Sequence, residues 1–467
     1  MNKTLTGRGL AALLLLSLLS SCGKDFLELV PQSEVNAANF YKTEADIRAA
    51  VNGAYGSMQS TSQYFGNFVY LLENRSDNIY DTNPGGNAGR EYSLDFFIET
   101  TDNGVIQGSW SSLYNGILQC NTVLDKIDAV PMNATAKEQL KAEMRFIRAL
   151  NYFHLVRMWG KVPLIIKALS PAETYSLGRN EVAEVYNAIE QDLTFAGATL
   201  PATYPVAQNG KATSGAALGL LGKVYLTQQK FLQAKNTLAQ VIATNRYQLL
   251  PNVADVFSVS NEYNAEILFA VRYSKTLAGE GHVLNPVFEF AGLNLDPTLL
   301  AAYASTDQRR DLLNVTRIDA NLAPVKKYFD TPFNNTSYGN DFPVLRYADV
   351  LLMYAEATNE VGFVANGDAL TNLNLVRTRA QAPAYTATAL ATQQSFRTAV
   401  YLERRLEFPL EEQRWYDLLR TGTAAAAIRS LGGNYAQNFQ DFRLLYPIPK
   451  SEIDKLNNPS FQQNPGY

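Results

Sequence analysis

Apolar residues recur at the spacing of an α-helix through most of this 467-residue chain, and this period constrains its fold more than any other feature. Thr43 precedes Asp46 in the spacing of a capping box, which marks a helix start. The apolar residues that follow fall at i, i+3, i+4, i+7, i+8 and i+11 and share one helix face: Ile47, Ala50, Val51, Ala54, Tyr55 and Met58. Such patterns predict a mainly all-α protein whose helices bury their apolar faces against one another.

Residues 216–242 carry the strongest local pattern, which matches a tetratricopeptide helix pair. The matching positions are Leu218, Leu221, Gly222, Tyr225, Ala234, Leu238 and Val241, whereas Arg246 stands where a terminal proline is usual. Because Gly222 and Ala234 are small, we expect the two helices to cross closely there. A looser pair covers 349–380, and the proline in Phe408-Pro409 should separate two further helices.

Two long segments interrupt this helical frame. We expect frame helices at about 43–59, 110–159, 181–250 and 346–422, and irregular insertions rich in Asn and Tyr at about 60–109 and 250–345. A little β-structure is expected within Glu266–Tyr273. The prediction is therefore a single domain over 22–467, built on tetratricopeptide-like helix pairs, whose long loops carry the binding residues.

The first 21 residues have the pattern of a signal peptide. Lys3 and Arg8 precede an apolar run from Leu10 to Leu19, which is too short to span a bilayer because spanning needs about 20 residues. Residues 19–22, ending at Cys22, resemble a bacterial lipobox, so we expect cleavage before Cys22 and its lipidation. Cleavage removes two cationic residues and changes the formal net charge from −4 to −6, a balance that disfavours nucleic-acid binding. We expect the mature protein to be anchored to a membrane without spanning it.

The inventory of reactive residues argues against catalysis. His154 and His282 are the only histidines, and Cys22 and Cys120 are the only cysteines, so lipidation of Cys22 excludes an internal disulfide. Gly85-Gly86 lacks the Lys-Ser/Thr of a phosphate loop. Opposite charges recur every three or four residues over 403–420, which indicates structural ion pairs rather than an acid–base pair. We predict no enzyme activity, no cofactor and no metal site, and we expect His154 and Cys120 to lie in the core.

Seven blocks of sequence, in the same order, are similar to the SusD/RagB family. They are CGKDFLE at 22–28 with Pro31, AEMRFIRA at 142–149 with the residues up to Leu164, RYADVLLMYAEA at 346–357, NLVRTRA at 374–380, ERRLE at 403–407 with RWYDLLR at 414–420, YPIP at 446–449, and QNPGY at 463–467. Glu412 departs from the family pattern, which usually has glycine there, and this puts the geometry of that turn in question.

This resemblance implies a function and a partner. It implies an outer-membrane lipoprotein, facing the cell exterior, that sits as a hinged lid over a SusC-type TonB-dependent barrel and delivers an oligosaccharide to it. Capture of peptides or protein fragments by the same architecture is one alternative. A scaffold that assembles with other proteins and binds no small ligand is another.

The ligand residues must come from the insertions if the three tryptophans belong to the frame. Trp110, Trp159 and Trp415 all lie in predicted helices, so any aromatic platform for a sugar ring should be Tyr or Phe, flanked by Asp, Asn or Arg for the hydroxyls. The candidates are Asn67, Arg75, Asp77, Asn78, Tyr80, Arg90, Tyr92, Tyr273 and His282. For each of these residues an ordinary loop or packing role is the favoured alternative, and Asp77–Asp81 lacks calcium-loop spacing.

Overall fold

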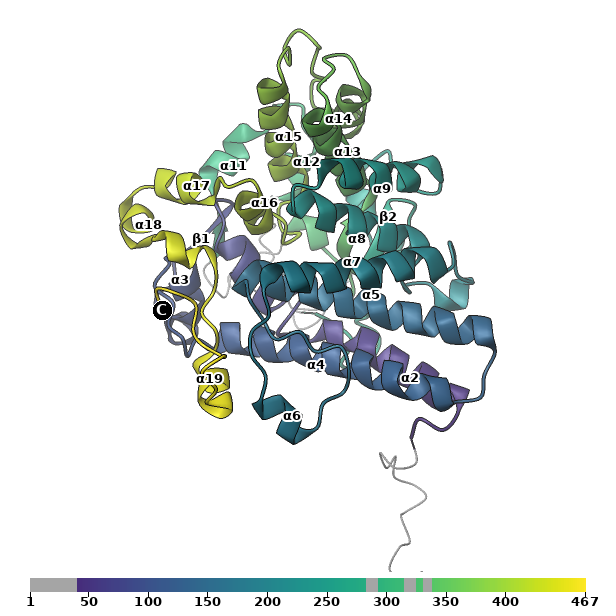
Figure 1. The fold of residues 1–467 in the computed structure, drawn as a ribbon. Helices are drawn as coiled ribbons and strands as arrows, with labels where there is room; N and C mark the ends of the chain where they lie inside the picture. The colour runs from purple at the N-terminus through teal and green to yellow at the C-terminus, as the bar shows by residue number, and fades with distance from the viewer. Residues whose placement is uncertain (1–39, 283–292, 315–324, 331–337) are drawn as a thin grey trace, which may run out of the picture.

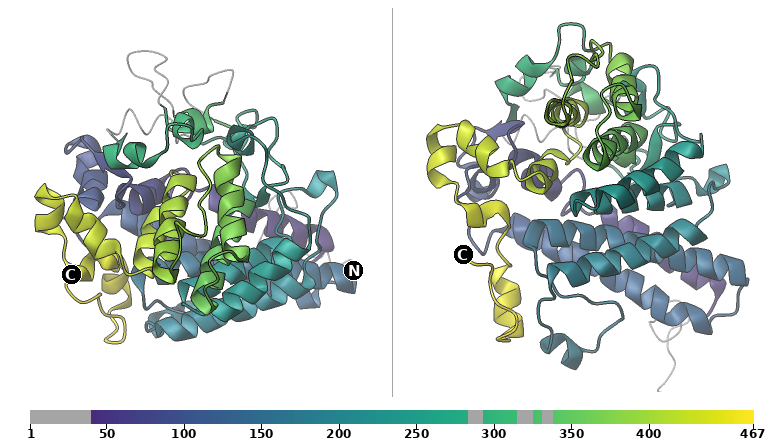
Figure 2. Two further views of the ribbon diagram at one scale, coloured as in Figure 1. Left: turned by 90° about the horizontal axis from the view of Figure 1, so that it is seen from above. Right: turned by 45° about the horizontal axis from the view of Figure 1, so that its top comes forward.

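The computed structural model describes residues 40–282, 293–314, 325–330 and 338–467, so Cys22 and the predicted signal peptide lie outside the described residues. Helices dominate the structure (Figure 1). The frame consists of α2 (Glu44–Gly56), α4 (Gly104–Lys126), α5 (Ala134–Trp159), α7 (Val182–Thr199), α8 (Ser214–Thr227), α9 (Phe231–Ala243), α13 (Tyr347–Val361), α14 (Asp368–Arg379) and α15 (Gln393–Glu407). Each frame helix packs on the next one along the chain, and α15 packs on both α13 and α14. The frame is thus a series of adjacent, mostly antiparallel helices, as Figures 1 and 2 show.

Local sequence explains where the frame helices begin. The predicted capping box is present, because the Thr43 hydroxyl accepts the Asp46 amide and the Asp46 carboxylate accepts the Thr43 amide. The start expected near Trp110 was wrong: α4 begins at Gly104, where the Asn103 side chain accepts the amides of Val105 and Ile106.

The close crossing predicted for residues 216–242 is present between α8 and α9. A Cβ atom added at Gly222 would lie 2.5 Å from Cδ2 of Leu238, so only glycine allows this approach, and Ala234 is fully buried. The tetratricopeptide-like character of this pair remains a prediction. The break at Phe408-Pro409 also separates two helices as expected, α15 and α16 (Arg414–Arg420).

The two insertions contain short elements that pair with each other. The first holds a π-helical turn (Val69–Asn74), β1 (Ile79–Asp81) and α3 (Arg90–Asp95); the second holds β2 (Ile267–Val271), β3 (Leu293–Leu295), α11 (Pro297–Ala302), α12 (Arg309–Leu312) and β4 (Phe342–Arg346). β2 lies within the predicted strand segment. β1 pairs antiparallel with β3, which joins the first insertion to the second, and β2 pairs antiparallel with β4 across the second insertion.

The remaining helices are short and lie at the edges of the frame. They are α6 (Pro171–Tyr175), α17 (Ala424–Ser430), α18 (Gly433–Asn438) and α19 (Lys450–Leu456). Figure 1 places α17 and α18 beside α3 and β1, at the opposite side of the molecule from β2. No helix among the described residues combines the length and hydrophobicity that crossing a membrane requires.

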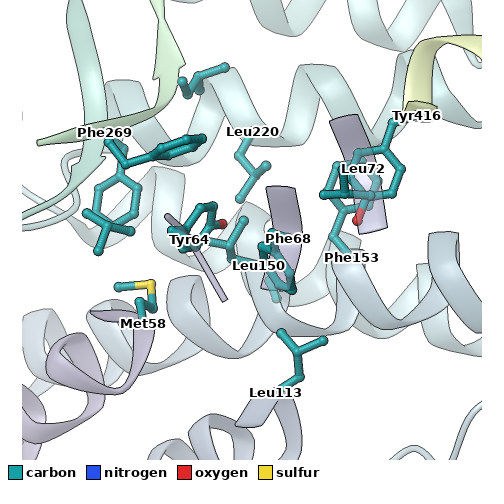
Figure 3. Close-up of a cluster of buried hydrophobic side chains, with 14 of the residues drawn as sticks. Met58, Tyr64, Phe68, Leu72, Leu113, Leu150, Phe153, Leu220, Phe269 and Tyr416 are labelled. Atoms are coloured by element: carbon teal, nitrogen blue, oxygen red, sulfur yellow. The ribbon is translucent and has the colours of Figure 1, made fainter. Parts of the chain in front are cut away.

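The main hydrophobic core joins the frame to both insertions. Figure 3 shows part of it, with side chains from the turn after α2 through to α16: Met58, Tyr64, Phe68, Leu72, Leu113, Leu150, Phe153, Leu220, Phe269 and Tyr416. Trp110, Trp159 and Trp415 are buried, as is Cys120, in agreement with their predicted roles. His154 is buried between two tyrosine hydroxyls, 2.7 Å from that of Tyr64 and 2.9 Å from that of Tyr416.

The charged run at 403–420 forms a buried ion-pair network, as predicted. Arg346 is the centre of this network, and its guanidinium contacts three carboxylates at 2.6–2.8 Å. The main pairs are Arg309 with Asp307, Glu403 and Glu407; Arg346 with Glu266, Glu407 and Glu411; Arg404 with Asp349 and Asp417; and Arg420 with Glu356 and Asp417. These carboxylates are paired with arginines, so the network links α13, α15, α16 and β4 rather than forming an acid–base site.

Candidate functional site

The structure divides the nine predicted ligand residues into a buried group and a surface group. Arg75, the most deeply placed, is 1% exposed, and its guanidinium lies 4.4 Å from the ring centres of both Phe97 and Tyr446. It donates to the Glu99 carboxylate at 2.9 Å and to the carbonyl of Arg443 at 2.6 Å. Arg75 therefore fastens the first insertion to the C-terminal segment.

Asp77 and Asn78 are also held by side chains of the frame. Arg414 donates to both carboxylate oxygens of Asp77, at 2.6 and 2.8 Å, which lowers the pKa of Asp77 even though burial acts to raise it. Arg405 donates to the side-chain oxygen of Asn78 at 2.9 Å and to the carbonyl of Asp77 at 2.6 Å. These contacts place the residues just before β1 against α15 and α16.

Three more candidates make internal contacts away from β1. Asn67 donates to the Val105 carbonyl at 3.1 Å, and the Tyr273 hydroxyl donates to the Tyr64 carbonyl at 3.0 Å. His282 is buried, and its ring stacks on Phe65 with a centroid distance of 3.6 Å. Burial lowers the pKa of His282 to about 3, so this imidazole is neutral at physiological pH.

Tyr80, Arg90 and Tyr92 form the surface group. Tyr80 is half-buried on β1 and lies directly opposite the exposed Asn294 of β3. Arg90 is exposed at the start of α3, where its carbonyl accepts the Asn103 side chain at 3.0 Å. The structure thus brings these three predicted residues to the surface on the β1–α3 side of the molecule, whereas the other six are held in internal contacts.

Tyr92 belongs to a stack of three half-buried aromatic rings, which we call the aromatic face. Its ring stacks on Phe96 at 4.3 Å with an interplanar angle of 26°, and Phe96 stacks on Tyr435 of α18 at 4.6 Å and 21°. All three residues are of intermediate exposure. The aromatic face therefore joins the first insertion to the C-terminal helices, two segments that lie side by side in Figures 1 and 2.

Backbone geometry and one buried carboxyl hold the aromatic face in place. Gly89, at φ +73°, turns the chain into α3, and Phe97, at φ +56°, reverses it at the other end. Asp95 accepts the Asp81 amide at 2.8 Å and the Tyr435 hydroxyl at 2.9 Å through one carboxylate oxygen. Burial raises the pKa of Asp95 well above its ordinary value, and burial followed by the neighbouring Asp95 raises that of Tyr435.

The chemistry of this surface suits a polyhydroxyl ring. Aromatic rings present apolar area that can cover the C–H face of a sugar. Tyr80 and Asn294 on the β1–β3 pair and Arg90 on α3 add polar side chains of both hydrogen-bonding senses on the same side of the molecule. No cluster of three His, Cys, Asp or Glu side chains suited to a metal ion occurs within the described ranges.

Sequence reasoning missed Phe96 and Tyr435. The spacing of Tyr92 and Phe96, four residues apart, is a usable signal, because such residues stack on one helix face. Tyr435 gives no such signal, because 340 residues separate it from Asp95.

Comparison with known proteins gives consistent matches along the chain. A family model described as "SusD family" matches residues 316–467, and one described as "Starch-binding associating with outer membrane" matches residues 25–226. SusD-like protein P25 of Formosa agariphila is 29% identical, with 93% of this chain and 94% of that protein covered. SusD-like protein P2 of the same organism is 27% identical, with 96% and 98% covered.

Solved structures give the same fold. A laminarin-binding SusD-like protein superposes with a TM-score of 0.77 at 28% identity, covering 91% of this chain and all of that one. A SusD homologue from Bacteroides thetaiotaomicron superposes with a TM-score of 0.79 at 24% identity, covering 95% and 100%.

Proposed function

This chain belongs to the SusD/RagB family, and on that premise we propose that it is a surface lipoprotein of the outer membrane that captures oligosaccharides on its aromatic face. The observation that carries the proposal is the stack of Tyr92, Phe96 and Tyr435. A solved relative at 28% identity is a laminarin-binding protein, which supports the ligand class.

Binding without cleavage is part of this proposal. Catalysis of glycoside hydrolysis requires two carboxyl groups facing a substrate. In the part of the chain that the structure describes, the dense carboxylates of 403–420 lie among buried arginines instead. We expect purified protein to leave laminarihexaose intact after prolonged incubation.

The anchor and the partner complete the proposal. Cys22 ends a lipobox-like segment, so we infer that it carries the lipid that holds the protein on the outer membrane. We further propose a partner on the basis of the family resemblance, a SusC-type TonB-dependent barrel over which the protein acts as a lid. The Cys22→Ser variant should be released from the membrane fraction, and the wild-type protein should co-purify with the barrel.

Saccharide binding by the aromatic face can be tested by calorimetry. We expect laminarihexaose or maltohexaose to bind the mature wild-type protein, and the Tyr92→Ala and Tyr435→Ala variants to lose at least tenfold in affinity. Tyr175→Ala is the matched control, because Tyr175 is 63% exposed on α6, far from the face. Equal losses from Tyr175→Ala and Tyr435→Ala would contradict this site.

The same experiment separates the alternatives. A protein that binds a mixture of short peptides and no saccharide would support capture of peptides. A protein that binds neither ligand but co-purifies with the barrel would be an assembly scaffold.

A further inference from the structure

A concave surface lies along strand β2. Figure 1 places β2 on the opposite side of the molecule from α3 and α18, which carry the aromatic face. The concave surface consists of two hollows of about 640 and about 250 Å³, which we call together the β2 groove. Strand β2 lines it, α2 forms one wall, and the segment 202–213 between α7 and α8 forms the other. The larger hollow is within the usual range for small-molecule sites, about 300–1,000 Å³.

Arg272 joins the two hollows and lines both. Its side chain passes over Gly210, where an added Cβ would lie 2.4 Å from Cδ of Arg272. Its guanidinium lies 4.5 Å from the ring centre of Tyr263, which is 45% exposed. Gly210, at φ +97°, thus permits a continuous groove, because any larger residue would displace Arg272.

The larger hollow presents side-chain amides that have no partner in the described structure. Asn52 on α2 and Gln208 are exposed, Asn209 is half-exposed, and none of the three makes a side-chain hydrogen bond with another described residue. Gln59 also lines the hollow, and its amide donates to Glu280 at 2.5 Å and to the Arg272 carbonyl at 2.8 Å. Free amides supply both donors and acceptors, which is what hydroxyl groups require.

The cations that line the larger hollow are already compensated, whereas Arg246, which lines the smaller hollow, is exposed. Arg48 pairs with Glu44 at 2.6 Å, and Lys211 pairs with Glu143 at 3.2 Å. Arg272 lies 3.6 Å from Glu262 and 3.5 Å from Asp341. In the larger hollow an anionic ligand would therefore find little uncompensated positive charge, and a neutral ligand is favoured there.

Backbone hydrogen bonds disfavour a peptide added as a strand beside β2. The Arg272 carbonyl accepts Gln59, the Tyr273 amide donates to Asp341 at 2.9 Å, and the Ala265 carbonyl accepts the Gln248 amide at 3.0 Å. These groups flank both ends of the strand, so an incoming peptide would have to displace existing bonds.

We propose that the β2 groove is a second binding site, for a neutral oligosaccharide held by the amides of Asn52, Gln208 and Asn209 and by Arg272. The β2 groove is a different site from the aromatic face of the proposed function. It rests on the proposed function only for the choice of saccharide probes. The two sites lie on opposite sides of one protein, so a long glycan chain or two separate chains can occupy both.

Hydrogen–deuterium exchange and calorimetry test this site separately from the aromatic face. The probes are laminarihexaose, maltohexaose, cellohexaose and mannohexaose, each added to the mature wild-type protein at millimolar concentration. We expect at least one hexasaccharide to protect the amides of 204–212, and this protection should persist in Tyr435→Ala.

Two variants connect the protection to the groove. Asn52→Trp, at an exposed helix position, should fill the larger hollow and abolish the protection of 204–212. Asn209→Ala should weaken binding there about 2- to 12-fold, the equivalent of one hydrogen bond of about 0.5–1.5 kcal/mol. Asn236→Trp, at an exposed position of α9, is the matched control and should change nothing.

The outcomes are distinct for the two sites. Lack of protection at 204–212 with all four probes overturns the inference, whether or not the aromatic face binds. Equal effects of Asn52→Trp and Asn236→Trp also overturn it. Loss of binding in Tyr435→Ala with retained groove protection would leave the inference intact and confirm that the sites are separate.

Discussion

Glu412 is a buried carboxyl on a left-handed backbone, and we expect its replacement by glutamine to stabilise the protein increasingly as the pH rises above about 5. The residue is 2% exposed and has φ +58°, a backbone conformation that favours glycine. Its amide donates to the Glu73 carboxylate at 2.6 Å. Neither of its own carboxylate oxygens has a hydrogen-bond partner among the described residues.

Burial, followed by the charge of Glu73, raises the pKa of Glu412 well above the ordinary value of 4.5. The folded state therefore keeps the Glu412 proton while the unfolded state releases it. The contribution of Glu412 to the free energy of unfolding is fully present below 4.5, the ordinary pKa of a glutamate. This contribution is lost as the pH rises toward the pKa that Glu412 has in the folded state. The loss amounts to about 1.4 kcal/mol per pH unit over that interval.

Glutamine has nearly the same shape and cannot ionise, so it removes this dependence and keeps the packing. We expect the free energy of unfolding of Glu412→Gln to be close to that of wild type at pH 4.5. The difference in favour of the variant should then grow by about 1.4 kcal/mol per pH unit. Burial also raises the pKa of Glu73, to about 7. The pH dependence of stability that Glu73 causes should be the same in wild type and variant, so it cancels in the difference between their free energies of unfolding.

Urea unfolding, followed by circular dichroism at pH 4.5, 5, 5.5 and 6, measures this difference directly. Glu138→Gln is the control, because Glu138 is an exposed residue of α5 and its replacement should stay within about 0.5 kcal/mol at every pH. A difference for Glu412→Gln that is constant from pH 4.5 to 6 would refute the reasoning, since it would mean that the carboxyl titrates alike in the folded and unfolded states.

Two other substitutions test the frame by the shift of the urea midpoint at pH 7. Gly222→Ala should cost about 1–3 kcal/mol, because its methyl group would lie 2.5 Å from Cδ2 of Leu238. The control Gly362→Ala places its methyl group in open space and should be nearly neutral. Equal effects of the two substitutions would contradict the close helix crossing. Glu407→Gln should cost about 3–5 kcal/mol, because it leaves Arg346 buried with less compensating charge, and a loss below about 1 kcal/mol would show that the network is not structural.

The helical frame was predictable because its signals are local. The period from Ile47 to Met58 and the glycine at 222 depend on neighbours within one helix or one helix pair. The start of α4 was misplaced because Gly104 and Gly108 weaken the apolar period in its first turns. The asparagine cap at 103 is the signal that could have corrected it.

The candidate site was predictable only in part because polar loop residues show their chemistry but not their partners. Arg75 and Asp77 have side chains suited to a sugar, yet their partners Arg443 and Arg414 lie more than 300 residues away in the sequence. Tyr435 joins the aromatic face through a contact of the same range. Contacts at that separation follow from the fold as a whole and leave no periodic pattern in the sequence.

The buried candidate residues can still affect binding, because they fix the position of the segment that carries Tyr80 and Tyr92. Arg414 and Arg405 hold Asp77 and Asn78 immediately before β1, and Arg75 is bonded to Glu99 immediately after α3. The segment 79–95 is thus fastened at both ends to the frame and the C-terminal segment. A surface fixed before the ligand arrives loses less conformational entropy on binding. The charged residues that resemble ligands in the sequence are therefore placed to pre-organise the Tyr80 and Tyr92 surface, beside the aromatic face that we propose as the ligand contact.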